Sequence, residues 1–119
     1  MRRVAILAAS GRELASARAA LGMVERRRLG SLEYAVGHTG DVEVYLIKTG
    51  MGPAAAAAAA QGILSEVALD AMVSTGYAGA LGSAGIGDVI VGTDVRDWTK
   101  GHAQAIFRAD PALLAIARE

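Results

Sequence analysis

The sequence contains no cysteine and few aromatic residues: one Trp, three Tyr and one Phe among 119 residues. Without thiols, the chain cannot form disulfide bonds, use a thiolate nucleophile or bind a metal through cysteine. Twelve basic side chains are balanced by twelve acidic ones, so the chain lacks the surplus positive charge that dominates affinity for nucleic acids. Because few rings are available for base stacking as well, these counts argue against a nucleic-acid-binding protein.

Long hydrophobic runs are also missing, since none approaches the roughly 20 residues that a membrane-spanning helix needs. The apolar stretch after Met1-Arg2-Arg3 covers only Val4–Ala9 and is interrupted by Arg12 and Glu13, which makes it too short for a signal peptide. We therefore expect a cytoplasmic protein without a membrane partner. The chain is nevertheless 53% hydrophobic, enough to bury a core, and its length predicts a single domain over residues 1–119.

Apolar runs alternate with helical patterns along the chain, which is typical of an α/β fold. Ser10 and Glu13 have the spacing of a capping box at a helix start. Pro53 fits the first position of an alanine-rich helix, and Thr39–Asp41 fits a hairpin turn. Strands are expected over residues 4–9, 32–38, 42–48, 71–74 and 88–95, and helices over residues 13–21, 53–69 and 111–118. We predict a mixed, largely parallel sheet flanked by helices.

Some conspicuous residues are assigned no function. Arg26–Arg28 is interpreted as a solvated edge rather than as a phosphate or nucleic-acid site, because the chain as a whole is neutral. His38 and His102 are far apart in the sequence and are expected on the surface, so no metal site is predicted. Trp98 is expected to anchor local packing.

Three glycine-bearing turns each follow a predicted strand. We call them the first turn (Ser10–Gly11), the second turn (Gly50–Gly52) and the third turn (Gly76–Gly79). If the strands are parallel, all three turns lie at the carboxyl edge of the sheet, where α/β proteins bind ligands. Glycine also lets backbone N–H groups approach a ligand closely. The turns therefore predict a site for an anion or a polar small molecule, although none has the context of a dinucleotide-binding fingerprint.

At these turns the sequence resembles the nucleoside phosphorylase and nucleosidase superfamily, which cleaves N-ribosidic bonds. The resemblance rests on Val4–Ala9 with Glu13, on Lys48–Ala55, on Ser74–Leu81 and on Gly87–Val91. It covers the N-terminal half of the family and implies a truncated form of its single α/β domain. The family's second half carries a Met-Glu segment that grips the ribose hydroxyls and an aspartate that protonates the leaving base. Neither has a counterpart in these 119 residues.

The resemblance also implies roles for individual residues. Glu13 matches the glutamate that activates the attacking water, and exclusion of solvent is expected to raise its pKa; the alternative is that Glu13 serves only the capping box. Arg12 matches a phosphate-binding position or is a solvated helix residue. Met51 matches a position that packs against the sugar and its 5′ substituent, or is plain core. Tyr77 departs from the small residue usual there. The full expected substrate-binding set is Ser10, Gly11, Arg12, Met51, Gly52, Gly76, Tyr77, Ala78 and Gly79.

Two classes of function remain open. In the first, the chain takes part in cleaving the N-glycosidic bond of a purine-type nucleoside, provided that another chain completes it. In the second, it is a non-catalytic relative that binds a nucleoside-like ligand or has only an assembly role. No cofactor is expected, and phosphate enters only as a co-substrate of phosphorolysis. The expected partners are a small nucleoside or base and either a second copy of the chain, in a homo-oligomer, or a complementing chain.

Overall fold

The computed structural model describes residues 2–98, 101 and 105–118. The chain divides into two units, Met1–Ala78 and Gly79–Glu119, and each is described by itself. His102 lies outside the described residues. His38 is exposed, as the sequence predicts, and lies 3.4 Å from the carboxylate of Glu43.

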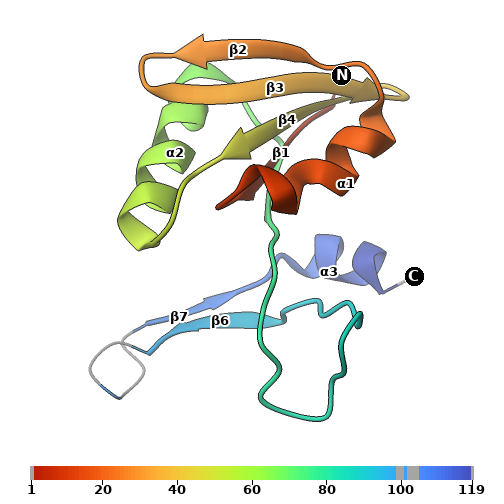
Figure 1. Ribbon diagram of the computed structural model, residues 1–119, viewed down its shortest axis with the longest axis vertical. Coiled ribbons are helices and arrows are strands. Elements are labelled where there is room, and N and C mark those ends of the chain that lie inside the picture. Colours follow the sequence, from red (N-terminus) through yellow and green to blue (C-terminus); the bar gives the residue numbers. More distant parts are fainter. Residues whose placement is uncertain (1, 99–100, 102–104, 119) are drawn as a thin grey trace. The chain divides into compact units, whose positions relative to one another are not determined.

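The first unit is built on a five-stranded sheet (Figure 1). Its strands are β1 (Arg2–Ala8), β2 (Glu25–Leu29), β3 (Leu32–Thr39), β4 (Val42–Lys48) and β5 (Ala71–Ser74), in the order β2-β3-β4-β1-β5. Strand β1 is parallel to both of its neighbours, whereas β3 is antiparallel to both of its own. Four of the five strands therefore run in one direction and only β3 opposes them, which confirms the mixed, largely parallel sheet.

Two helices cover opposite faces of this sheet (Figure 1). Helix α1 (Gly11–Leu21) buries Leu14 against one face, where it meets side chains of β1, β3 and β4. Helix α2 (Pro53–Glu66) buries Ala59 and Ile63 against the other face. The two apolar clusters explain why the central strands are apolar on both sides, as strands sandwiched between helices must be.

Local sequence signals set the ends of both helices. Ser10 caps α1 with the predicted capping box. Pro53 occupies the first turn of α2, but the helix ends at Glu66 rather than at residue 69, because Val67 adopts an extended conformation. Gly62 lets α2 approach the sheet closely, since a Cβ built there would lie 3.2 Å from a methyl carbon of Leu32. No helix in the described part of the chain is both long and apolar enough to cross a membrane.

The hairpin of β3 and β4 is confirmed, and its turn residue Gly40 has a φ of 59°, which favours glycine. Strand β2 was not predicted. Its arginine run Arg26–Arg28 lies on an exposed edge strand, a position where charged side chains are common because they discourage pairing with other chains. The run therefore lies at an exposed edge, as interpreted from the sequence, and the segment is a strand that the sequence did not predict.

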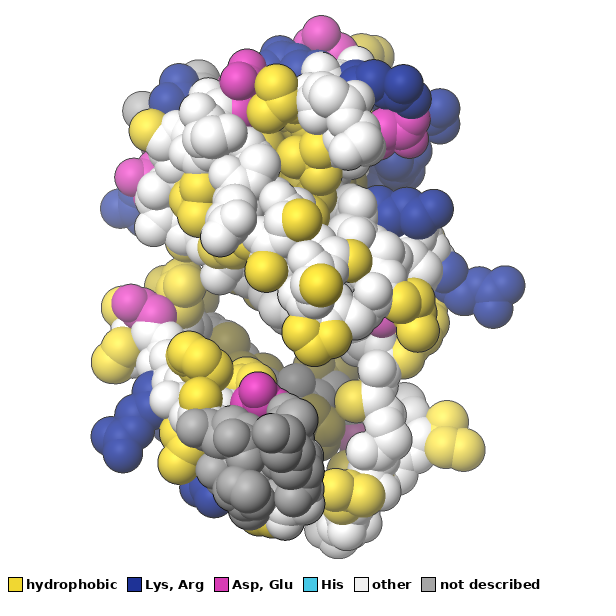
Figure 2. Space-filling model, turned by 90° about the vertical axis from the view of Figure 1, so that its left-hand side faces the viewer, with side chains coloured by type: hydrophobic (Ala, Val, Ile, Leu, Met, Phe, Trp, Pro, Cys, Tyr) yellow, Lys and Arg dark blue, Asp and Glu magenta, His cyan; other side chains and the backbone are white. Residues whose placement is uncertain are grey.

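The second unit contains strands β6 (Asp94–Asp97) and β7 (Ala105–Arg108), which pair as an antiparallel ribbon, and helix α3 (Pro111–Ala117), capped by Asp110. None of its described residues is buried, and Figure 2 shows hydrophobic side chains at the surface of this unit, in the lower part of the view.

Two sequence predictions are wrong in this second unit. The strand expected over residues 88–95 begins only at Asp94, because no described strand pairs with Val89–Val91, whose side chains are exposed. A strand needs a partner for its backbone hydrogen bonds whatever its side-chain propensity. Trp98 is 63% exposed and does not anchor packing.

Candidate functional site

The three turns follow parallel strands and meet at one edge of the sheet, as the sequence predicts. Strands β4, β1 and β5 lie side by side and point the same way. The Gly50 N–H donates to the carbonyl of Ala9 at 3.2 Å, and the Thr75 N–H donates to the carbonyl of Leu7 at 2.9 Å. These hydrogen bonds extend the sheet pairing into the turns. Gly79 begins the second unit and is not part of the site described here.

The carboxylate of Glu13 connects the first turn to the third. Its Oε1 accepts hydrogen bonds from the Ser10 hydroxyl at 2.7 Å and from the Ser10 N–H at 3.1 Å. Its Oε2 accepts a hydrogen bond from the Tyr77 N–H at 2.9 Å. The capping-box carboxylate thus also fixes the spacing between the first and third turns.

The hydrogen bonds hold the pKa of Glu13 below its usual range. The Ser10 hydroxyl contributes most, followed by the Tyr77 N–H, with a smaller contribution from the Ser10 N–H, and the slight burial of the carboxyl opposes them. Donors to a carboxylate favour its charged form. The expected rise in pKa from exclusion of solvent is therefore wrong for this chain, because the carboxylate is well supplied with donors and little covered.

Gly76 and Tyr77 shape the space around this carboxylate. A Cβ built on Gly76 would overlap Oε2 of Glu13, so only glycine leaves room for the carboxylate there. The Tyr77 side chain is 74% exposed, and its hydroxyl donates a long hydrogen bond of 3.5 Å to the carbonyl of Arg12. The phenol therefore reaches across to the start of α1 and borders the site.

The other residues of the predicted substrate-binding set in this unit lie at the same edge of the sheet and are exposed to solvent. Met51 is 86% exposed, which rules out its alternative role as plain core. Gly52 has a φ of 92° and caps α2 without a side-chain hydrogen bond. Gly11, Arg12 and Ala78 are exposed. This edge is therefore open to solvent, and the substrate-binding roles of these residues stay predictions.

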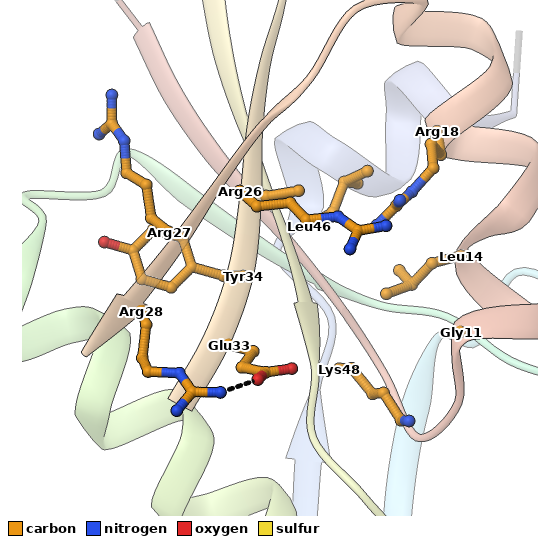
Figure 3. A pocket seen from close by; sticks show the side chains of 11 residues that line it. Gly11, Leu14, Arg18, Arg26, Arg27, Arg28, Glu33, Tyr34, Leu46 and Lys48 are labelled. Atoms are coloured by element: carbon orange, nitrogen blue, oxygen red, sulfur yellow. Dashed lines mark hydrogen bonds and ion pairs between the residues drawn. The ribbon is translucent and has the colours of Figure 1, made fainter. Parts of the chain in front are cut away.

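Sequence reasoning missed a cavity of about 450 Å³ on the face of the sheet that α1 partly covers (Figure 3). We call it the basic cavity. It is lined by Gly11, Leu14, Arg18, Arg26, Arg27, Arg28, Glu33, Tyr34, Ala35, Leu46 and Lys48. The cavity could have been predicted from the sequence only if residues 25–29 had been recognised as a strand paired with β3.

Within residues 2–98, 101 and 105–118, no group of three or more His, Asp or Glu side chains is placed to hold a metal ion. That the chain uses no cofactor stays a prediction.

A family model described as the phosphorylase superfamily matches residues 3–119. This chain belongs to the phosphorylase superfamily. It is 29% identical to the 5′-methylthioadenosine/S-adenosylhomocysteine nucleosidase of Chromohalobacter salexigens over 100% of its length, and 31% identical to that of Maridesulfovibrio salexigens over 98%. It covers 56% of each of these proteins, so it spans about half the length of the curated relatives that it matches.

Solved structures of superfamily members agree in fold. The Neisseria meningitidis nucleosidase of the same name, in complex with methylthio-immucillin-A, superimposes with a TM-score of 0.88 at 26% identity, over 99% of this chain and 57% of that one. The Colwellia psychrerythraea nucleosidase, in complex with adenine, gives a TM-score of 0.85 at 25% identity, over 98% of this chain and 54% of that one. The phosphorylase-like α/β fold predicted from the sequence is thereby confirmed over the part of these structures that the chain spans.

Proposed function

We propose that this chain supplies the water-activating part of a nucleosidase site that cleaves the N-glycosidic bond of a purine-type nucleoside, with 5′-methylthioadenosine as the first substrate to test. The observation that carries the proposal is the hydrogen-bonded position of Glu13 between the first and third turns. The proposal requires the remainder of the site, which the longer relatives possess, to be supplied by further polypeptide.

Three hydrogen bonds leave Glu13 one acceptor position for a water. An ionised carboxylate offers about four lone-pair sites, and the two Ser10 donors and the Tyr77 N–H occupy three of them. The remaining site lies on Oε2, which has only one donor among the described residues. A water bound there has its oxygen oriented by a fixed carboxylate, as a general base must orient the nucleophile that it activates.

In the proposed reaction, the water oxygen bonds to the anomeric carbon while the carbon–nitrogen bond to the base breaks. Glu13 accepts a proton from the water, and an acid outside these 119 residues protonates the departing base. The lowered pKa keeps Glu13 ionised at neutral pH, which a base requires, although it also weakens the base. Covering the site with further polypeptide would raise that pKa by desolvation.

Release of adenine from 5′-methylthioadenosine, followed by chromatography, tests the proposal. The chain alone should be nearly inert, because one positioned general acid contributes about 10²–10⁴-fold. Adding a separately produced C-terminal part of a nucleosidase relative should restore release. Glu13→Gln should then abolish it, whereas Glu66→Gln, at the exposed end of α2, should not. Restored release that Glu13→Gln leaves intact would contradict the assignment.

A second candidate is a chain that binds a nucleoside without turnover. It is favoured by the open edge at Met51 and Tyr77 and by the chain's half-length match to its relatives. Calorimetry with adenine separates the two: binding together with persistent inactivity after complementation supports this second candidate.

We further propose that the chain assembles with itself or with a complementing chain. Strand β5 is a sheet edge that pairs only with β1 among the described residues, and an unpaired edge is a template for another strand. Sedimentation velocity at micromolar concentration should therefore give a species of twice 12.1 kDa. A monomer in the absence of any partner would contradict self-assembly.

A further inference from the structure

The basic cavity concentrates positive charge in a neutral protein. Five of the twelve Lys and Arg residues line this one cavity, against a single acidic residue, Glu33. Among the residues of the three turns only Gly11 lines it, so most of the cavity lies on the sheet face, away from the edge at which Glu13 meets Tyr77.

The strand register decides which of these side chains face the cavity. Arg26 is paired with Ala35, and Ala35 with Leu46, and the last two belong to the apolar cluster under α1. Arg26 therefore lies on the α1 face. Arg27 is paired with Tyr34, which belongs to the cluster under α2, so the alternation directs the Arg27 side chain to the opposite face. Arg27 and Tyr34 nevertheless also line the cavity.

The same alternation places Arg28 and Lys48 on the α1 face, two residues from Arg26 and Leu46 respectively. Helix α1 adds Arg18, one helical turn after the buried Leu14. Figure 3 shows the Arg18 and Arg26 side chains pointing toward one another from α1 and β2, while Arg27 extends away.

Ion pairing leaves part of this charge uncompensated. Arg28 pairs with Glu33, and Arg27 pairs with Glu25 at 3.3 Å. Arg18, Arg26 and Lys48 have no ion pair among the described residues. Like charges directed into one cavity repel one another, and an anion between them removes that repulsion.

We propose that the basic cavity binds a phosphate-class anion, a pyrophosphate or phosphomonoester group, held by the guanidinium groups of Arg18 and Arg26 with Lys48 as a third contact. Guanidinium forks match the oxygens of phosphate groups, and such charge-assisted hydrogen bonds are stronger than neutral ones. A cavity of about 450 Å³ has the size of a small-molecule site. This site goes beyond the proposed function, because it requires neither a nucleoside nor Glu13.

Isothermal titration calorimetry of the full chain with sodium pyrophosphate tests the proposal. Arg18→Gln and Arg26→Gln should each weaken binding about tenfold or more, the scale of one lost charge-assisted hydrogen bond. Arg2→Gln is the matched control, since it removes the same charge from an exposed position of β1 that does not line the cavity, and it should change affinity less than about twofold on this scale. Absence of binding, or equal weakening by Arg2→Gln and Arg26→Gln, would overturn the proposal.

Further measurements test where the anion binds and whether binding is specific for phosphate groups. In the unaltered chain, added pyrophosphate should shift the NMR amide signals of Arg18, Arg26 and Ala35 more than those of β5, a readout that does not depend on any variant folding. Sulfate or duplex RNA that binds as tightly as pyrophosphate would overturn the phosphate assignment. Glu13→Gln should keep its affinity for pyrophosphate, so this site and the proposed nucleosidase function fail or succeed separately.

Discussion

The two units of this chain have comparable sequence signals and different internal packing. Among the residues that the structure describes, every buried hydrophobic one lies between Ala5 and Ile63, in the first unit. The second unit has the β-branched run Val89–Val91 and the aromatic residues Trp98 and Phe107, yet none of its described residues is buried. Local propensity is thus not sufficient for a core: apolar segments form one only where other segments bring a complementary apolar face.

Amide hydrogen exchange should show the largest difference between the units. Amides of β1, β3 and β4 should exchange orders of magnitude more slowly than those of residues 79–93, because exchange in the core requires global opening whereas exposed segments open locally. Mass spectrometry of peptic fragments would measure this. Equal protection over residues 79–93 would mean that this segment is covered in solution.

Substitution of one isoleucine in each unit should change the free energy of unfolding by very different amounts. Ile63→Ala should lower the free energy of unfolding by about 2–5 kcal/mol, because Ile63 is fully buried between α2 and the sheet. Ile86→Ala, at a fully exposed position in the second unit, should change it by less than about 0.5 kcal/mol. Urea unfolding followed by circular dichroism would measure both. A large loss at Ile86 would show that the second unit packs against something.

Removing the N-cap of a helix should also affect stability differently in the two units, although by less than the core substitution. Ser10→Ala should cost about 1 kcal/mol, since it removes the cap of a helix that packs on the sheet. Asp110 accepts hydrogen bonds from the Ala112 and Leu113 N–H groups at 2.9 and 3.0 Å, but its helix buries no residue, so Asp110→Ala should leave the thermal unfolding midpoint nearly unchanged. Ser16→Ala, on the exposed face of α1, is the control for Ser10→Ala.

The smallest expected effect is the pH-dependent contribution of Glu13 to the stability of the first unit. Because its folded pKa is lowered, its contribution to stability is present above the usual glutamate pKa and is lost as the pH falls through the lower folded value. NMR titration should find that Ser10→Ala raises the pKa of Glu13, since the Ser10 hydroxyl is the main cause of its lowering. An unchanged pKa in Ser10→Ala would contradict this cause, and Ser16→Ala should leave it unaltered.

Predictions from the sequence were confirmed where a short motif by itself determines the local backbone structure. The capping box of Ser10 and Glu13 and the Gly40 turn act within a few residues, and the structure contains both. Predictions failed where the outcome depended on distant partners. Strand β2 was missed because Arg26–Arg28 lacks apolar alternation, and its pairing with β3 alone makes it a strand.

The candidate site was predictable only in outline for the same reason. Parallel strands brought the three turns to one edge, as their order implied. The hydrogen bond from the Tyr77 N–H to Glu13 spans 64 residues, and no spacing rule could give it. The basic cavity could not be predicted, because its lining depends on the register of β2 with β3, and β2 itself was not predicted from the sequence.

The capping role of Glu13 has a consequence for evolution. Functional residues are often a burden on stability, so a lineage that abandons its chemistry tends to replace them. Glu13 instead also holds the start of α1 through both of its hydrogen bonds from Ser10, and its loss would penalise folding even in a descendant with no substrate. Persistence of this glutamate in a diverged gene therefore records selection on the scaffold as readily as selection on catalysis. Turnover, rather than the presence of the residue, has to distinguish the two.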